Sequence, residues 1–215
     1  LFFMTIGPKL KWIKSALSDK IELIVFFTTS LLISILIVKN LKIDFLLNTI
    51  LITFSFYLFF ITLKDFIVKK YLNLSQNIAH FGFSLLILSI LFNNFFTTEI
   101  ITNLKVGEKF ESKDFKIKFE NLYQKNKQNF KSIIGEFTIE NSQGDIEIMK
   151  PELRIYNQPN ISTSEADIKT NLLSDKFMTM NIVQNQEYFN IRYQNKPLMI
   201  WIWISVILIS LSGFI

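Results

Sequence analysis

Residues 78–96 read IAHFGFSLLILSILFNNFF, an apolar stretch whose one ionisable side chain is His80. Its length is close to the ~20 residues that a helix needs to cross the hydrocarbon core of a bilayer. Apolar runs of similar length occupy residues 21–38, 45–63 and 198–215. The first two of these have charges at their ends and lack the polar stripe of a soluble core helix. The sequence therefore predicts an α-helical membrane protein with about four transmembrane helices.

The composition indicates one part in the membrane and one part outside it. Apolar residues make up 50% of the 215 residues, charged residues make up 19%, and the net charge is +5. The lysines are scattered and form no dense basic stripe, so no nucleic-acid binding is expected. Cysteine is absent, which excludes disulfides and thiolate metal sites within the chain. Because the chain begins at Leu1 and ends inside an apolar run, we expect a fragment or a naturally split subunit.

Residues 97–196 alternate apolar and polar side chains, which is typical of half-buried strands. The alternation is clearest at 115–120, 136–140 and 188–193. We predict a small antiparallel β-rich domain at 97–196. It would be inserted between a membrane region at 1–96, with helices at about 21–38, 45–63 and 78–96, and a final transmembrane helix at 197–215. Its core should include Phe115, Phe119, Phe137, Ile139, Phe189 and Ile191.

Two local signals refine this domain. Residues 141–145 contain Gly144, which can adopt a positive φ, and they lead into another alternating segment, so we predict a hairpin there. Ser162 and Glu165 have the spacing of a capping box, which predicts a short helix that ends at about Leu172.

The lysines that flank the apolar runs predict the orientation. Residues 9–20 hold Lys9, Lys11, Lys14 and Lys20, and the loop after the second run holds Lys64, Lys69 and Lys70. The loop after the first run holds only Lys39 and Lys42. By the positive-inside rule the lysine-rich side is cytoplasmic. We therefore expect a multi-pass protein of the bacterial inner (cytoplasmic) membrane, or an organellar equivalent, with residues 97–196 in the periplasm.

His80 is the candidate functional residue, because an ionisable group inside a membrane is costly and needs a partner. On a helix it shares one polar face with three other side chains: Asn73, Gln76 and Ser84. Ala79 and Gly82 would let a bulky planar ligand or another helix come close. His80 is therefore either a structural histidine or an axial ligand of a haem iron, with its other ring nitrogen oriented by Gln76 or Ser84.

Other catalytic arrangements are disfavoured. A Ser/His/Asp triad would need the single histidine, which lies in a membrane run. The carboxylates of the soluble segment give no reason to select an acid/base pair, and solvated faces or turn caps are the simpler interpretation for Glu99, Glu152, Glu165 and Asp167. A transporter fragment is also disfavoured, because the runs lack interior charges and Gly/Pro-broken helix pairs.

Several separated blocks resemble, in order, the CcmF-type cytochrome c haem lyases, a cytochrome c-type biogenesis family. The blocks are GPKLKW at 7–12, AHFG at 79–82, Thr98-Glu99, Leu104 and Gly107-Glu108, PELRIY at 151–156, TSEADI at 163–168, and the segment 196–203 with its two tryptophans, Trp201 and Trp203. One departure is Ser164-Glu165-Ala166-Asp167, which stands where the family typically has Thr-Glu-Ala-Ala.

The resemblance implies a b-type haem held between two transmembrane histidines. His80 matches the more C-terminal of the two, so it would be an axial ligand of the haem iron, and the second ligand would lie outside this chain. The tryptophan-rich motif that receives haem is absent here, so a complete lyase active site is not expected. The implied partners are membrane lipid, haem, apocytochrome c and other maturation subunits, including the haem chaperone. The alternative is a non-catalytic scaffold subunit with a structural histidine.

Overall fold

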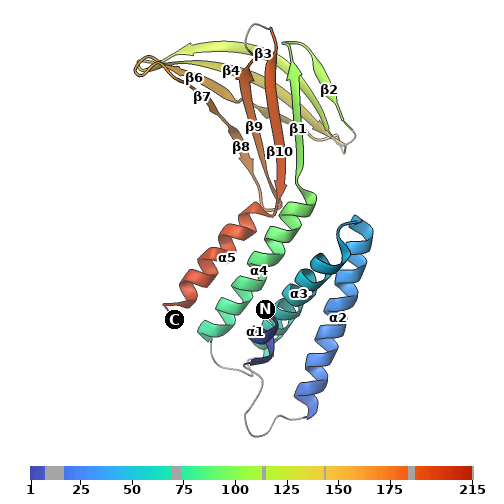
Figure 1. The fold of residues 1–215 in the computed structure, drawn as a ribbon. Coiled ribbons are helices and arrows are strands. Elements are labelled where there is room, and N and C mark those ends of the chain that lie inside the picture. Colours follow the sequence, from blue (N-terminus) through green and yellow to red (C-terminus); the bar gives the residue numbers. More distant parts are fainter. Residues whose placement is uncertain (8–16, 69–73, 113–114, 143, 184–186, 215) are drawn as a thin grey trace. The chain divides into compact units, whose positions relative to one another are not determined.

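The computed structural model of the protein describes residues 1–7, 17–68, 74–112, 115–142, 144–183 and 187–214. They form two compact units, Leu1–Phe96 with Leu198–Ile215, and Thr97–Pro197. Helices build the first unit and strands build the second (Figure 1). Some residues named in the sequence analysis lie outside the described residues. They are the block at 7–12, except Gly7, and Lys9, Lys11, Lys14, Lys69, Lys70 and Asn73.

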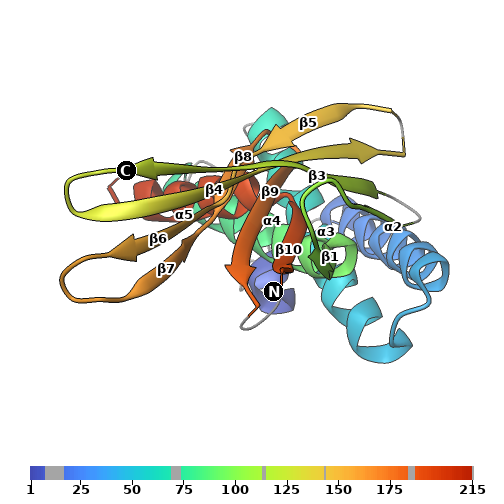
Figure 2. The ribbon, with the colours of Figure 1, turned by 90° about the horizontal axis from the view of Figure 1, so that it is seen from above.

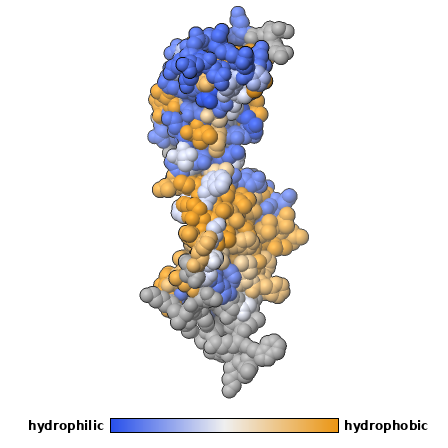
Figure 3. All heavy atoms as spheres, turned by 90° about the vertical axis from the view of Figure 1, so that its left-hand side faces the viewer, coloured by the Kyte–Doolittle hydropathy of each residue, from blue (hydrophilic) through white to orange (hydrophobic). Residues whose placement is uncertain are grey.

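Among its described residues, the helical unit has three helices of membrane-spanning length. Residues 21–41 of α2, all of α3 and all of α4 are long and apolar enough to cross a bilayer, whereas α5 has 14 residues. An apolar surface covers the helices on the face shown in Figure 3. The predicted α-helical membrane protein is thus confirmed, and a shorter apolar helix, α5, lies where the fourth transmembrane helix was predicted. The helices are α1 (Phe2–Ile6), α2 (Leu17–Leu41), α3 (Phe45–Val68), α4 (Leu74–Phe96) and α5 (Met199–Ser212).

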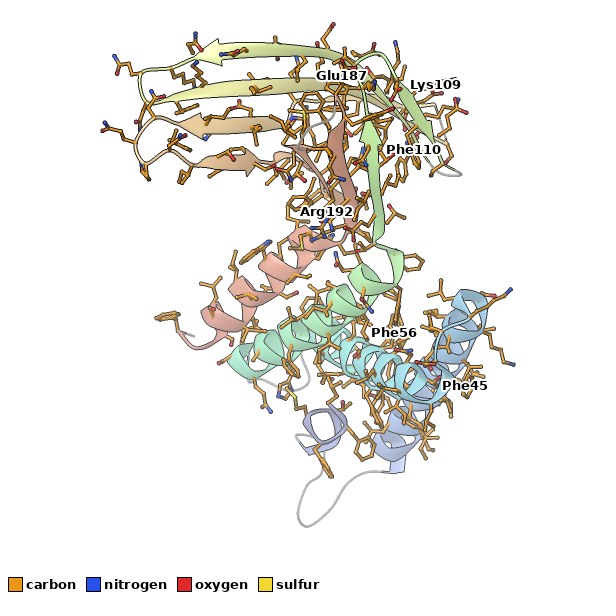
Figure 4. The ribbon with its side chains drawn as sticks, turned by 45° about the horizontal axis from the view of Figure 1, so that its top comes forward. Phe45, Phe56, Lys109, Phe110, Glu187 and Arg192 are labelled. Atoms are coloured by element: carbon orange, nitrogen blue, oxygen red, sulfur yellow. The ribbon has the colours of Figure 1, made fainter. Side chains whose placement is uncertain are left out.

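The long helices pack side by side in chain order (Figure 1). Between α2 and α3, the buried hydroxyls of Ser34 and Thr53 lie 2.6 Å apart. Aromatic rings join α3 to α4, where Phe81 contacts Phe59 and Phe66 at centroid distances of 5.2 and 5.7 Å. Phe56 of α3, labelled in Figure 4, lies against the ring of Phe92 further along α4. These helices are thus held together by small polar pairs and large rings, because the hydrophobic effect does not drive helix association in lipid.

The strand-rich unit is an antiparallel β-sandwich. One sheet has the strand order β1-β10-β9-β8, and the other has the order β2-β3-β4-β6-β7 with β5 also paired to β4. Strands of one sheet cross those of the other steeply (Figure 2), as in orthogonal sheet packing. The bounds are β1 (Thr98–Leu104), β2 (Lys109–Glu111), β3 (Phe115–Asn126), β4 (Phe130–Asn141), β5 (Ile146–Met149), β6 (Glu152–Tyr156), β7 (Ser162–Glu165), β8 (Asp167–Thr170), β9 (Ser174–Ile182) and β10 (Phe189–Pro197).

The sandwich core lies where alternation predicted it. Phe119 and Phe137 are fully buried, and their rings stack at a centroid distance of 4.3 Å. Ile139 and Ile191 are buried in the same cluster, and Phe115 and Phe189 pack against it, so the predicted core is confirmed. The predicted core did not include six further buried members of this cluster: Leu104, Ile117, Met149, Met178, Met180 and Tyr193.

The two local signals had different outcomes. The predicted hairpin is confirmed, since β4 pairs with β5 and Gly144 has a φ of +86°. The predicted helix from Ser162 to Leu172 is wrong. Ser162 and Glu165 are the ends of β7, which pairs with β6, and the Ser164 hydroxyl donates to the carbonyl of Met180 at 2.9 Å. Strand pairing and this contact to the other sheet outweigh the capping-box spacing.

Candidate functional site

His80 lies near the start of α4 with its side chain partly buried. Successive residues of an α-helix are rotated by about 100°. His80 is therefore about 100° from Phe81, which contacts α3, and about 160° from Gly82, which contacts α5. The imidazole faces neither the α5 contact nor the centre of the α3 contact. This face of α4 is where a group outside the described helices could reach the ring.

The polar stripe around His80 is only partly available to the imidazole. Gln76 is partly buried on the same face. Ser84 is fully buried, and its hydroxyl donates to the carbonyl of Phe81 at 2.8 Å. Its one hydrogen is therefore used by the helix backbone and is not free for a ring nitrogen. Of the described residues of this stripe, Gln76 is the better candidate to orient the ring.

Another helix, α5, occupies the space beside Gly82. A Cβ atom added at Gly82 would lie 3.0 Å from Cγ1 of Ile209 and 3.2 Å from the carbonyl oxygen of Ser205. Further along this seam the Ser75 hydroxyl donates to the carbonyl of Ser212 at 2.5 Å. The sequence left a planar ligand or a helix open for this position, and the structure places a helix there. Gly82 thus serves close helix packing.

We expect Gly82→Ala to destabilise the helical unit by about 1–3 kcal/mol, because the added methyl group overpacks the α4–α5 seam. Thermal unfolding of the full chain in detergent measures this. Gly213→Ala is the matched control, since a Cβ there meets only the Ser210 carbonyl at 3.5 Å. A melting temperature that falls equally in both variants would contradict the close approach at Gly82.

The carboxylates of the sandwich have structural partners. Glu152 accepts hydrogen bonds from the Ser132 hydroxyl at 2.9 Å and from Nε of Arg154 at 3.1 Å. Burial acts to raise the pKa of Glu152, but these two hydrogen bonds together with the charges of Arg154 and Lys127 outweigh it, and the pKa lies below its ordinary value. Glu165 accepts from the Thr163 hydroxyl, and Asp167 accepts from the backbone N–H of Lys150.

The other sheet carries a similar pair, in which Arg192 of β10, labelled in Figure 4, contacts Glu99 of β1. Among the residues that the structure describes, no group of three or more His, Asp or Glu side chains could hold a metal ion. These observations favour the interpretation of Glu99, Glu152, Glu165 and Asp167 as structural side chains over a role in acid/base chemistry.

Comparisons with known proteins agree with the sequence resemblance. Residues 95–197 match the family model described as "CcmF C-terminal beta-sandwich". The cytochrome c-type biogenesis protein CycK of Bradyrhizobium diazoefficiens is 23% identical over 136 residues, which are 63% of this chain and 21% of that protein. The cytochrome c-type biogenesis protein CcmF of Haemophilus influenzae is 25% identical over 138 residues, 64% of this chain and 21% of that protein.

The fold of the whole chain is also shared. A solved structure titled "Cytochrome c Heme Lyase CcmF" superposes with a TM-score of 0.74 at 15% sequence identity, covering 99% of this chain and 37% of that chain. The chain spans about a fifth of the length of the curated relatives it matches, 21% in both cases. The sandwich match, the biogenesis relatives and the shared fold together support a similarity of the chain to a C-terminal portion of CcmF-type proteins.

Proposed function

We propose that the chain is the haem-binding C-terminal part of a cytochrome c haem lyase, the enzyme that attaches haem covalently to apocytochrome c. The observation that carries this proposal is the fold match over 99% of the chain to a structure with that title, together with biogenesis proteins among its relatives. Because the chain spans a fifth of those relatives, the lyase activity would belong to the complete protein and not to this part alone.

His80 would hold the haem iron, and the residues around it fit one side of such a group. A neutral imidazole is a usual axial ligand of haem iron. The ring is partly exposed on a face of α4 that the α5 contact leaves free, and Gln76 shares that face. The chain contains one histidine, so a bis-histidine site would take its second ligand from elsewhere. A bound haem b would supply redox chemistry, and His80 would fix its position in the membrane.

The proposed location is the inner membrane, with residues 97–196 in the periplasm, where the sandwich would dock apocytochrome c or maturation subunits such as the haem chaperone. The distribution of lysines supports this orientation. Trp203 of α5 has 61% of its surface exposed, as suits a ring in the interfacial belt.

An alkaline phosphatase fusion after Asn141 should be active, and a cytoplasmic reporter at the same position should be inactive. A fusion in the 69–70 segment should show the opposite pattern, because its lysines favour the cytoplasmic side. An inactive phosphatase at Asn141, with an active cytoplasmic reporter there, would reverse the orientation.

Deletion of the gene in its native host tests the function. Haem staining of denatured membrane proteins should show the loss of c-type cytochromes, whose haem is covalent, while non-covalent b-type cytochromes persist in spectra. Complementation with a His80→Ala variant separates the two alternatives. A scaffold subunit with a structural histidine would restore c-type cytochromes fully, whereas a lyase part with His80 as a haem ligand would not. Unchanged c-type cytochromes in the deletion strain would contradict both.

A further inference from the structure

One end of the four-stranded sheet is joined to the helices through two short connections. The helix α4, which is long and apolar enough to cross a bilayer, ends at Phe96, and β1 begins at Thr98. At the same end of the sheet β10 finishes at Pro197, and α5 begins at Met199. A helix that crosses a bilayer ends at the bilayer surface. This end of the sheet therefore begins at that surface.

The turn between β8 and β9, residues 171–173, lies at this same end of the sheet. Residues directly opposite one another on paired strands form rows across a sheet. Near this end one such row is polar and consists of Thr98, Asn195 and Lys176. Two residues further along, Ser174 at the start of β9 pairs with Pro197 at the end of β10. The strand register thus places the β8–β9 turn beyond the last paired residues, at the end that begins at the bilayer surface.

The β8–β9 turn carries two exposed leucines. The side chains of Leu172 and Leu173 are 65% and 73% exposed. Turns usually hold Gly, Asn, Asp, Ser or Pro, so turn chemistry does not explain two adjacent leucines. Residues 170–174 contain no charged side chain, and the next residue, Asp175, is only 7% exposed. Removal of this apolar pair from water is favourable and would bring no exposed charge of these residues with it.

Hydrogen bonds within the turn satisfy three of its backbone N–H groups. The side-chain oxygen of Asn171 accepts from the N–H of Leu173 at 2.9 Å and from the N–H of Ser174 at 2.7 Å. The N–H of Asn171 donates to the carbonyl of Ser174 at 3.1 Å. Backbone donors that leave water need partners within the protein, because lipid supplies none. The leucine side chains can therefore enter lipid without leaving these three donors unsatisfied.

We propose that the β8–β9 turn inserts Leu172 and Leu173 into the lipid interface of the bilayer from which β1 emerges. A stable protein interface buries about 800 Å² on each partner, far more than two leucine side chains offer, whereas a lipid interface needs no matching surface. With the two chain connections, the inserted turn is a third attachment and restricts the tilt of the sandwich against the membrane. The proposal is independent of haem binding by His80 and of which side of the membrane the sandwich occupies.

The test uses the full chain in nanodiscs of phosphatidylcholine and phosphatidylglycerol. Because the chain contains no cysteine, Leu173→Cys provides a single thiol for the fluorophore NBD. A nitroxide on the lipid headgroups should quench this label several-fold more strongly than a label at Ile182→Cys, the matched control. Ile182 is 46% exposed at the other end of β9, roughly 26 Å of strand from Ser174, whereas the interfacial region is only about 5–7 Å thick. Aqueous iodide should quench the two labels in the opposite order.

A second label position shows whether the leucines themselves, and not an apolar label, hold the turn in lipid. A label at Thr170→Cys, an exposed residue just before the turn, leaves both leucines in place. Adding Leu172→Ser and Leu173→Ser should lower its quenching by the lipid nitroxide several-fold, because the exposed pair that enters lipid is lost. Three outcomes would overturn the proposal: equal lipid quenching of the labels at Leu173 and Ile182, equal quenching at Thr170 with and without the leucines, or protection of the Leu173 label from both lipid nitroxide and iodide. The last would assign the leucines to a protein contact, within this chain or with a second copy.

Discussion

Replacement of His80 by alanine in the complete protein should remove or strongly weaken the membrane haem while the protein stays inserted. A lost axial ligand vacates the iron, but the change shortens no apolar span. The substitution also leaves the Ser75 contact and the Gly82 seam to α5 intact, because these lie on another face of α4. The measurement is haem per protein in purified wild-type and variant samples at matched expression.

Added imidazole should partly restore the haem spectrum of His80→Ala, because the cavity left by the ring admits a free ligand of the same chemistry. Gln76→Ala should have a smaller effect, a shift in haem potential, since it would act through a hydrogen bond to the ring. Ser84→Ala should change little, because that hydroxyl bonds to the Phe81 carbonyl. Haem content and spectrum that are unchanged in His80→Ala would remove His80 from the ligand list. A parallel fall of protein and haem would favour the scaffold alternative.

Periodicity predicted those parts of the fold in which one face of an element is clearly apolar. In residues 115–119 of β3 and 137–139 of β4 a single set of alternating positions is apolar, and Phe119 and Phe137 lie in the core as expected. In β9 the neighbours Phe177 and Met178 are both apolar, so alternation alone does not select the buried face. The pairing with β10, which places Met178 opposite Tyr193, decides it.

Features that join distant segments could not be predicted. The haem-ligand candidate was found because one ionisable residue in an apolar run is conspicuous. The α5 seam depends on Ser205 and Ile209, more than a hundred residues from Gly82. The polar row of Thr98, Asn195 and Lys176 likewise exists only after three strands pair. The local sequence does not indicate such rows. In the same way, the capping-box spacing at Ser162 did not indicate that this segment pairs with β6 as strand β7.

The sandwich should depend strongly on Phe137, and Phe137→Ala is expected to cost about 3–5 kcal/mol of its stability. Phe137 is fully buried and stacks on Phe119, so truncation removes buried apolar surface, a ring pair and the filling of the core. A Cβ added at Gly135 would lie only 2.6 Å from the Phe137 ring, which shows how little free space surrounds it. The ring is therefore closely packed by its neighbours, and its removal should leave a cavity.

Hydrogen exchange by mass spectrometry on the full chain measures this loss of stability within the sandwich. Tryptophan fluorescence would not, because Trp12, Trp201 and Trp203 all lie outside residues 97–197. Protection of β3 and β4 amides should fall by about two to four orders of magnitude, as follows from the expected cost at 1.36 kcal/mol per tenfold change. Ile161→Ala, at a side chain that is 50% exposed, is the control and should change protection little. If Phe137→Ala loses no more protection than Ile161→Ala, then the Phe137 ring does not stabilise the contact between the two sheets. The methionines of β9 would then have to provide the close packing around Gly135 and Phe119.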